Sequence, residues 1–200
     1  MFRKGSFLLI ILGLVFILTG CDLVKDIAKG KPEINECLYG TWQLKGGEAF
    51  LRATIPVGAL DQNSLTFSGG GGAVYYNFKD DGTLAVLASP LIGRFSVKLE
   101  QTVGDLDIDM QGLASAKYTG DDDQIQVGEI VNNEITYSAV LDGEEMMNSV
   151  ISGDFLPLFV EPNRTAEFQC SGDSLLLTIV GLPGDIPPIE FVRIKPTPTP

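Results

Sequence analysis

Alternation of apolar and polar residues at a period of two is the feature that most constrains the fold of this chain. In residues 95–100 (FSVKLE) and 135–139 (ITYSA), apolar side chains fall on one face of an extended chain and polar side chains on the other. This pattern is typical of strands with one buried face. About ten such segments fit between Thr41 and Ile194, which predicts an all-β fold.

Short turn signals separate these segments. They are KDDG at residues 79–82, GDDD at 120–123, DG at 142–143 and SGD at 171–173. Asp-Gly pairs supply the positive φ angles of tight hairpins, so segments adjacent in sequence should pair as an antiparallel meander. Closing such a meander removes both exposed sheet edges, which predicts a barrel of about 8–10 strands.

Two segments interrupt this regular pattern. Residues 68–72 (SGGGG) lack the Gly-Lys-Ser/Thr sequence of a phosphate-binding loop, and we expect a flexible hairpin loop there. Residues 48–64 (EAFLRATIPVGALDQNS) form an insertion, which is predicted to contain a short helix at the barrel mouth.

The N-terminal segment has the features of an export signal. Arg3 and Lys4 precede an apolar run at residues 7–18, which is shorter than the about 20 residues of a membrane span but suits the core of a signal peptide. The sequence LTGC at residues 18–21 resembles the lipobox of bacterial lipoproteins. The resemblance implies cleavage before Cys21 and attachment of lipid to its thiol, and two acyl chains suffice as an anchor. The alternative is an ordinary signal peptide or an N-terminal membrane helix that happens to precede a cysteine.

This interpretation divides the chain into four parts. Residues 1–20 are the signal peptide, and residues 21–36, which contain Gly30 and Pro32, are a tether. Residues 37–195 are the barrel, and residues 196–200 (PTPTP) are an extended tail, since proline lacks the N–H that a sheet requires. The expected location is the outer side of the cytoplasmic membrane or elsewhere in the cell envelope.

Charge and composition exclude several functions. The chain has 26 acidic and 14 basic residues, and loss of Arg3 and Lys4 with the signal peptide would change the net charge from −12 to −14. Such a surface repels phosphate backbones and anionic headgroups, so we expect no nucleic-acid partner and membrane contact through the lipid alone. The chain contains no histidine, which excludes Ser-His-Asp and Cys-His catalysis and imidazole-rich zinc sites. We therefore expect neither enzymatic activity nor a cofactor.

Four short motifs carry a second resemblance. They are LYGTW at residues 38–42, FKDDGTL at 78–84, CSGDSL at 170–175 and FVR at 191–193. Together they resemble the lipocalin-like domains of bacterial lipoproteins. The resemblance implies that Trp42 closes one end of the barrel and that Arg193 packs against it. The insertion at residues 48–64 departs from the family pattern.

Cys37 and Cys170 remain once Cys21 is lipidated. An even number of cysteines in an oxidising compartment predicts a disulfide between them, and two buried free thiols are the alternative.

Asp105, Asp107 and Asp109 alternate with apolar residues, which places them on one face of a strand. Their spacing of about 6.5–7 Å is too wide for one calcium ion without ligands from another segment. A solvated outer face is the preferred interpretation, a calcium site is the alternative, and we predict no metal site.

Small residues alternate before Tyr118, at Gly112, Ala114 and Ala116. If this face points inward, it leaves room for an apolar cavity, and we expect Ala114, Ala116 and Tyr118 to contact a lipid tail or another small hydrophobic molecule. The sequence thus predicts a lipid-anchored envelope lipoprotein that binds such a ligand. A filled barrel that serves as a structural or protein-interaction module is the alternative.

Overall fold

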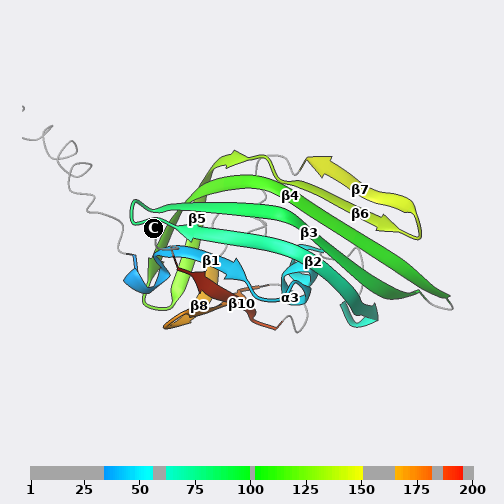
Figure 1. The fold of residues 1–200 in the computed structure, drawn as a ribbon, viewed down its shortest axis with the longest axis horizontal. Coiled ribbons are helices and arrows are strands. Elements are labelled where there is room, and N and C mark those ends of the chain that lie inside the picture. Colours follow the sequence, from blue (N-terminus) through cyan, green and yellow to red (C-terminus); the bar gives the residue numbers. More distant parts are fainter. Residues whose placement is uncertain (1–33, 56–61, 100–101, 151–164, 182–186, 196–200) are drawn as a thin grey trace, which may run out of the picture. The chain divides into compact units, whose positions relative to one another are not determined.

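The computed structural model describes residues 34–55, 62–99, 102–150, 165–181 and 187–195 (Figure 1). A compact unit begins at Ile34. The predictions for the signal peptide, for Cys21, for most of the tether and for the tail concern residues outside the described ranges.

The described residues form one sheet of ten strands, and each strand pairs with its neighbours in antiparallel orientation. This confirms the predicted all-β fold. The strands are β1 (Gly40–Leu44), β2 (Leu65–Phe78), β3 (Thr83–Leu99), β4 (Thr102–Asp121), β5 (Gln124–Asn133), β6 (Thr136–Leu141), β7 (Glu144–Val150), β8 (Thr165–Ser171), β9 (Ser174–Ile179) and β10 (Ile189–Ile194).

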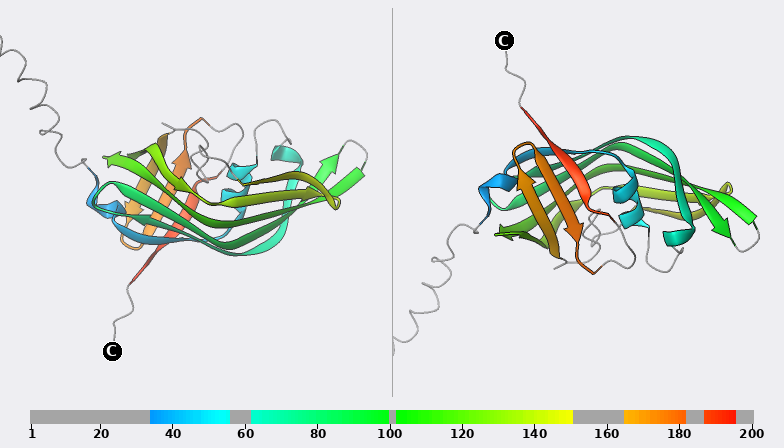
Figure 2. Two further views of the ribbon diagram at one scale, coloured as in Figure 1. Left: turned by 90° about the horizontal axis from the view of Figure 1, so that it is seen from above. Right: turned by 90° about the horizontal axis from the view of Figure 1, so that it is seen from below.

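Eight of these strands close into a ring. The order is β1, β2, β3, β4, β5, β8, β9 and β10, with β10 paired back to β1. The ring is a meander with one departure, since the β6–β7 hairpin lies between β5 and β8 in sequence. One edge of β4 is divided between two partners: residues 114–121 pair with β5 and residues 106–111 pair with β6. The long strands therefore extend past the ring, which is not a regular barrel (Figures 1 and 2).

Alternating burial follows the sequence pattern most clearly in β4. Buried and exposed positions alternate along most of its length, and the buried side chains of Leu106, Ile108 and Met110 lie on the inner face of the sheet. Hairpins form at the four predicted turns. Asp142 and Gly143, for example, have φ angles of 52° and 83°, which a tight two-residue hairpin requires.

The glycine-rich segment at residues 68–72 differs from its prediction. The prediction of a flexible hairpin loop is wrong, because these residues lie within β2. They pair with β3, at Gly70↔Gly93 and Gly71↔Ile92, with two bulges nearby. Sheet hydrogen bonds need only the backbone, so glycine can form them. The strands also approach closely at this point, and a Cβ atom on Gly72 would collide with the carbonyl oxygen of Pro90.

The predicted helix in the insertion is α3 (Glu48–Thr54), and two short 3-10 helices, η1 (Glu36–Leu38) and η2 (Gln62–Ser64), complete the described elements. Phe50 and Leu51 of α3 are fully buried. A Cβ atom on Gly93 would collide with the Leu51 side chain, so α3 packs closely against the inner face of β3. None of the helices among the described residues is long and apolar enough to cross a membrane.

Large side chains occupy the interior of the ring. The largest fully buried ones include Trp42, Tyr76, Phe78 and Phe191. The Tyr76 and Phe191 ring centroids lie 5.0 Å apart, within the range of favourable aromatic pairs. We call the end of the ring beside η1 the closed end and the end beside α3 the mouth, because β1 runs from the first to the second.

Candidate functional site

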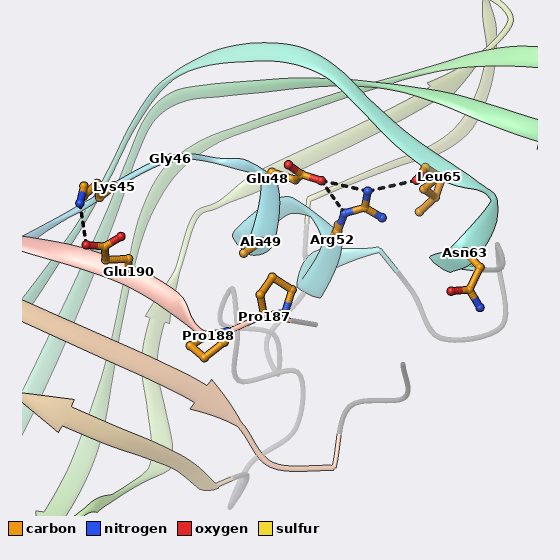
Figure 3. A pocket seen from close by; sticks show the side chains of 10 residues that line it. All are labelled: Lys45, Gly46, Glu48, Ala49, Arg52, Asn63, Leu65, Pro187, Pro188 and Glu190. Carbon is orange, nitrogen blue, oxygen red and sulfur yellow. Dashed lines mark hydrogen bonds and ion pairs between the residues drawn. The ribbon is translucent and has the colours of Figure 1, made fainter. Parts of the chain in front are cut away.

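A pocket of about 540 Å³ lies at the mouth. Its walls come from the end of β1, from α3, from η2 and the start of β2, and from the residues that lead into β10 (Figure 3). We call it the mouth pocket, and its lining residues are Lys45, Gly46, Glu48, Ala49, Arg52, Asn63, Leu65, Pro187, Pro188 and Glu190.

One wall carries the ion pair between Lys45 and Glu190. The Lys45 Nζ atom lies 2.7 Å from Glu190 Oε1, and the two side chains are 62% and 40% exposed. The Lys45 backbone N–H also donates to the Glu190 carbonyl oxygen at 2.7 Å. The β1–β10 ladder therefore continues one residue past β1 and brings together two charges that are far apart in sequence.

The opposite wall carries the ion pair between Glu48 and Arg52 of α3. The Arg52 Nη2 atom lies 2.9 Å from Glu48 Oε1 and donates to the Leu65 carbonyl oxygen at 3.0 Å. The guanidinium carbon lies 5.5 Å from the centroid of the Phe95 ring, and only 17% of the Arg52 side chain is exposed. Arg52 is therefore held by a contact within its own helix and by contacts with two other elements, β2 and β3.

The charges of the mouth pocket balance. Two cations, Lys45 and Arg52, face two anions, Glu48 and Glu190, in a chain whose net charge is −12. Because these four charges cancel, the pocket attracts neither cations nor anions over neutral molecules. The pocket is therefore suited to a polar ligand that is neutral or carries both charges.

The closed end contains the residues that the lipocalin-like resemblance singled out. The guanidinium carbon of Arg193 lies 4.0 Å from the centroid of the Trp42 ring, a cation–π contact. Arg193 donates to the carbonyl oxygens of Cys37 and Tyr39, the former at 2.7 Å. Trp42 Nε1 donates to the Leu38 carbonyl oxygen at 2.7 Å. Arg193 thus packs against Trp42, as the resemblance implied.

Cys37 and Cys170 form a disulfide, which confirms the predicted pairing. Their Cα atoms lie 6.2 Å apart, although 133 residues separate them in sequence. The bond joins η1 to β8 at the closed end.

Ala114, Ala116 and Tyr118 point into the ring, and all three side chains are buried. The Tyr118 ring lies 5.2 Å from that of Phe78, and its hydroxyl donates to the Lys79 carbonyl oxygen at 2.9 Å. Burial raises the pKa of this hydroxyl. These residues do not line the mouth pocket, and the hydrophobic ligand expected beside them stays a prediction.

Asp105, Asp107 and Asp109 lie on the outer face of β4, where all three are exposed. Arg94 Nε lies 3.1 Å from Asp107 Oδ1. Among the described residues, no group of three or more Asp, Glu, Cys or His side chains is arranged to hold a metal ion.

Sequence reasoning missed the mouth pocket. The spacing of Glu48 and Arg52, four residues apart on a predicted helix, is a signal that could have found one wall. Lys45 and Glu190 had no such local signal, because only the pairing of β1 with β10 brings them together.

No protein-family model, curated protein or solved structure matches this chain.

Proposed function

We propose that this chain is a lipid-anchored protein of the cell envelope that binds a small polar molecule at the mouth pocket, without catalysing a reaction. The observation that carries the proposal is the pair of opposed ion pairs, Lys45–Glu190 and Glu48–Arg52, across a pocket of about 540 Å³. This volume lies within the about 300–1,000 Å³ that small-molecule sites commonly occupy.

The ligand class follows from which of these charges can change partner. Lys45 and Glu190 are exposed, and exposed ion pairs contribute only about 0–1 kcal/mol, so a ligand can replace either partner at small cost. Arg52 stays in place through its contacts with Leu65 and Phe95. We therefore propose a zwitterion, with its ammonium group at Glu190 and its carboxylate at Lys45.

Three matched molecules test this ligand class on the full-length chain in detergent. Dialanine is a zwitterion, its N-acetyl derivative is an anion and its amide is a cation. Because ligands that bind only the folded state raise its melting temperature, dialanine should raise it and the two derivatives should not. Glu190→Gln should weaken dialanine binding by about tenfold or more, as expected for loss of a charged hydrogen-bond partner. Equal shifts with all three molecules, or no shift with any, would contradict the proposal.

The anchor is tested separately, by replacing Cys21. If lipid on this thiol holds the protein on the membrane, Cys21→Ala should move the chain from the detergent phase to the aqueous phase in a phase-partition experiment. Continued firm membrane association of this variant would make the apolar run at residues 7–18 the anchor.

A hydrophobic ligand inside the ring is the second candidate function. It is favoured by the small buried side chains of Ala114 and Ala116, which lie opposite Val86 and Leu84 of β3. A fluorescent fatty acid should then bind in a 1:1 ratio, and Ala114→Leu with Ala116→Leu should block it. If the ring is instead a filled structural or interaction module, the fatty acid should not bind, and these substitutions should cost about 1–3 kcal/mol by overpacking.

A further inference from the structure

The outer wall of the ring carries a block of uncharged residues, which we call the neutral face. It lies on β2, β3 and β4, which run side by side there (Figure 1). Its members alternate with buried residues such as Val74, Val86 and Ala114, so their side chains face outward. They are Ala73, Tyr75 and Asn77 of β2, Ala85, Leu87 and Ser89 of β3, and Gln111, Leu113 and Ser115 of β4. A chain with 26 acidic and 14 basic residues thus leaves a patch across three strands without a charge.

Apolar side chains lie at the centre of the neutral face. Leu87 and Leu113 are directly paired across β3 and β4, and each is 44% exposed. Tyr75 pairs with Leu87 from the other side and is partly exposed. Leucine and tyrosine side chains are typical of protein surfaces that lie at the boundary between lipid headgroups and acyl chains. The composition of the neutral face therefore suits contact with a membrane surface.

Charged residues surround the neutral face. Lys117 of β4 lies toward the closed end, and Asp109 and the Arg94–Asp107 pair lie farther along β3 and β4 in the opposite direction. Glu134 lies beside β4, to which its backbone N–H donates. An anionic surface would be repelled by these carboxylates but not by the residues of the neutral face.

We propose that the neutral face lies on the membrane to which the chain is anchored, with Leu87 and Leu113 inserted among the lipid headgroups. This inference rests on the lipid anchor at Cys21 proposed above. It revises the expectation of membrane contact through the lipid alone, which followed from the net charge of the whole chain. That charge repels anionic lipid from the acidic surfaces, and the repulsion is weakest on a side without carboxylates.

The point where the tether enters the fold favours this occupant. Ile34, the first described residue, pairs with Gly120 of β4, the strand that carries Leu113. Gly120 and Leu113 are seven residues apart, a distance of about 24 Å along a strand. The 13 residue steps from Cys21 to Ile34 span at most about 45 Å. The tether is therefore long enough for lipid on Cys21 to enter the same membrane surface as Leu113.

The tether also allows a weak contact to persist. A linker raises the effective concentration of the two surfaces that it holds together, so the second contact needs little affinity of its own. Two half-exposed leucines are too few to hold a free protein on a membrane, where even a single myristoyl chain is marginal. In an anchored protein they need only set its orientation. The mouth pocket stays accessible in this orientation, since no residue of the neutral face lines it.

Fluorescent labels on opposite sides of the ring test this orientation. Ser89→Cys places a label on the neutral face, and Thr178→Cys places one on β9, four strands away from β3 in either direction around the ring. The full-length chain is reconstituted into vesicles of phosphatidylethanolamine and phosphatidylglycerol with brominated acyl chains. Non-reducing conditions keep Cys37 and Cys170 paired. The bromine atoms should quench the label of Ser89→Cys and not that of Thr178→Cys.

Leu87→Gln with Leu113→Gln is the matched variant. Both positions are half-exposed, so the melting temperature should stay that of the parent chain, whereas quenching of the Ser89→Cys label should fall to the level of Thr178→Cys. Equal quenching at the two labelled positions, or quenching at Ser89→Cys that survives the double substitution, would overturn the proposal. Shielding of this label in native membranes but not in vesicles of lipid alone would also overturn it, and would assign the face to a protein partner.

Mass spectrometry of the same sample separates this proposal from the anchor. Lipid on Cys21 with equal quenching at both positions would leave the anchor in place and exclude the docking. An unmodified Cys21 with quenching confined to Ser89→Cys would do the reverse. Dialanine binding checks the fold of the Leu87→Gln, Leu113→Gln variant and should equal that of the parent chain, because neither residue lines the mouth pocket.

Discussion

The closed end and the mouth of the ring are held together by different kinds of interaction. At the closed end, Trp42 is fully buried, Arg193 lies over its ring, and the Cys37–Cys170 disulfide joins η1 to β8. At the mouth, the Lys45–Glu190 pair is largely exposed, and the Glu48–Arg52 pair lies on a helix of only seven residues. Buried and covalent interactions are costly to remove, whereas exposed ion pairs are weak. We therefore expect the closed end to dominate stability and the mouth to remain free to exchange partners.

Trp42→Ala should have the largest effect on stability. It removes a fully buried indole, the hydrogen bond to the Leu38 carbonyl oxygen and the cation–π contact with Arg193. Substitution of a buried tryptophan by alanine costs about 3–5 kcal/mol, and we expect a value near the upper limit because of these lost partners. The loss should appear as a lower urea midpoint for unfolding. A cost below about 1 kcal/mol, the range of exposed ion pairs, would remove the distinction between the two ends.

Removal of the disulfide should have the next largest effect. Cys37→Ser with Cys170→Ser opens a loop with a sequence separation of 133 residues, which the chain-entropy model values at about 4–5 kcal/mol before native-state strain. Chemical reduction of the parent chain should give the same urea midpoint as the double variant. If the midpoint does not move, the hydrogen bonds from Arg193 to the carbonyls of Cys37 and Tyr39 hold η1 without help from the disulfide.

Much of the fold was predictable, because strands and tight turns are local patterns. Period-two alternation indicated the strands, and Asp-Gly and related turns indicated which neighbours pair. The glycines at 69–72 were misread because glycine favours loops by its own conformational freedom, while here the close approach of β3 decides the structure. The β6–β7 hairpin was predicted by its turn, but its place beside β4 was not, since alternation does not say which part of β4 pairs with which strand.

The residues of the closed end could be predicted from the sequence, whereas those of the mouth could not. Trp42, Arg193 and the cysteines could be found because their residue types are rare in this chain or belong to short motifs. Lys45 and Glu190 are common surface residues whose meeting depends on the register of β1 with β10. The register between distant strands is not encoded in any short segment. The mouth pocket could therefore be identified only from the folded structure.

Alkaline pH should affect the half of the molecule beside the mouth first. Burial raises the pKa of Tyr137 from its usual 10 to about 12, while a hydrogen bond with Thr54 of α3 lowers it in part. Burial also raises the pKa values of Tyr76 and Tyr118, which lie nearer the closed end. The unfolded chain releases the tyrosine protons above about pH 10, whereas the folded chain keeps them, so stability should fall as pH rises from 10 to 12. One such group contributes at most about 1.4 kcal/mol per pH unit.

Tyr137→Phe separates this group from the other buried tyrosines. In the parent chain, tyrosinate absorbance at 295 nm should include a step near pH 12 from the folded state, and the variant should lack it. The variant should also lose stability less steeply between pH 10 and 11. An unchanged absorbance curve would mean that another tyrosine ionises first and that α3 is not the element most sensitive to alkali.

The smallest effect is expected from the ion pair at the mouth. Lys45→Met or Glu190→Gln should change the free energy of unfolding by less than about 1 kcal/mol, because the pair is exposed to solvent and its attraction is screened. The difference from the parent chain should shrink further in high salt. Urea unfolding at two salt concentrations measures both effects, with Arg94→Met, which breaks the exposed pair with Asp107 on the outer face, as the matched control. A loss of several kcal/mol in Glu190→Gln, but not in Arg94→Met, would make the mouth a determinant of stability, and its charges would then be too firmly held to exchange with a ligand.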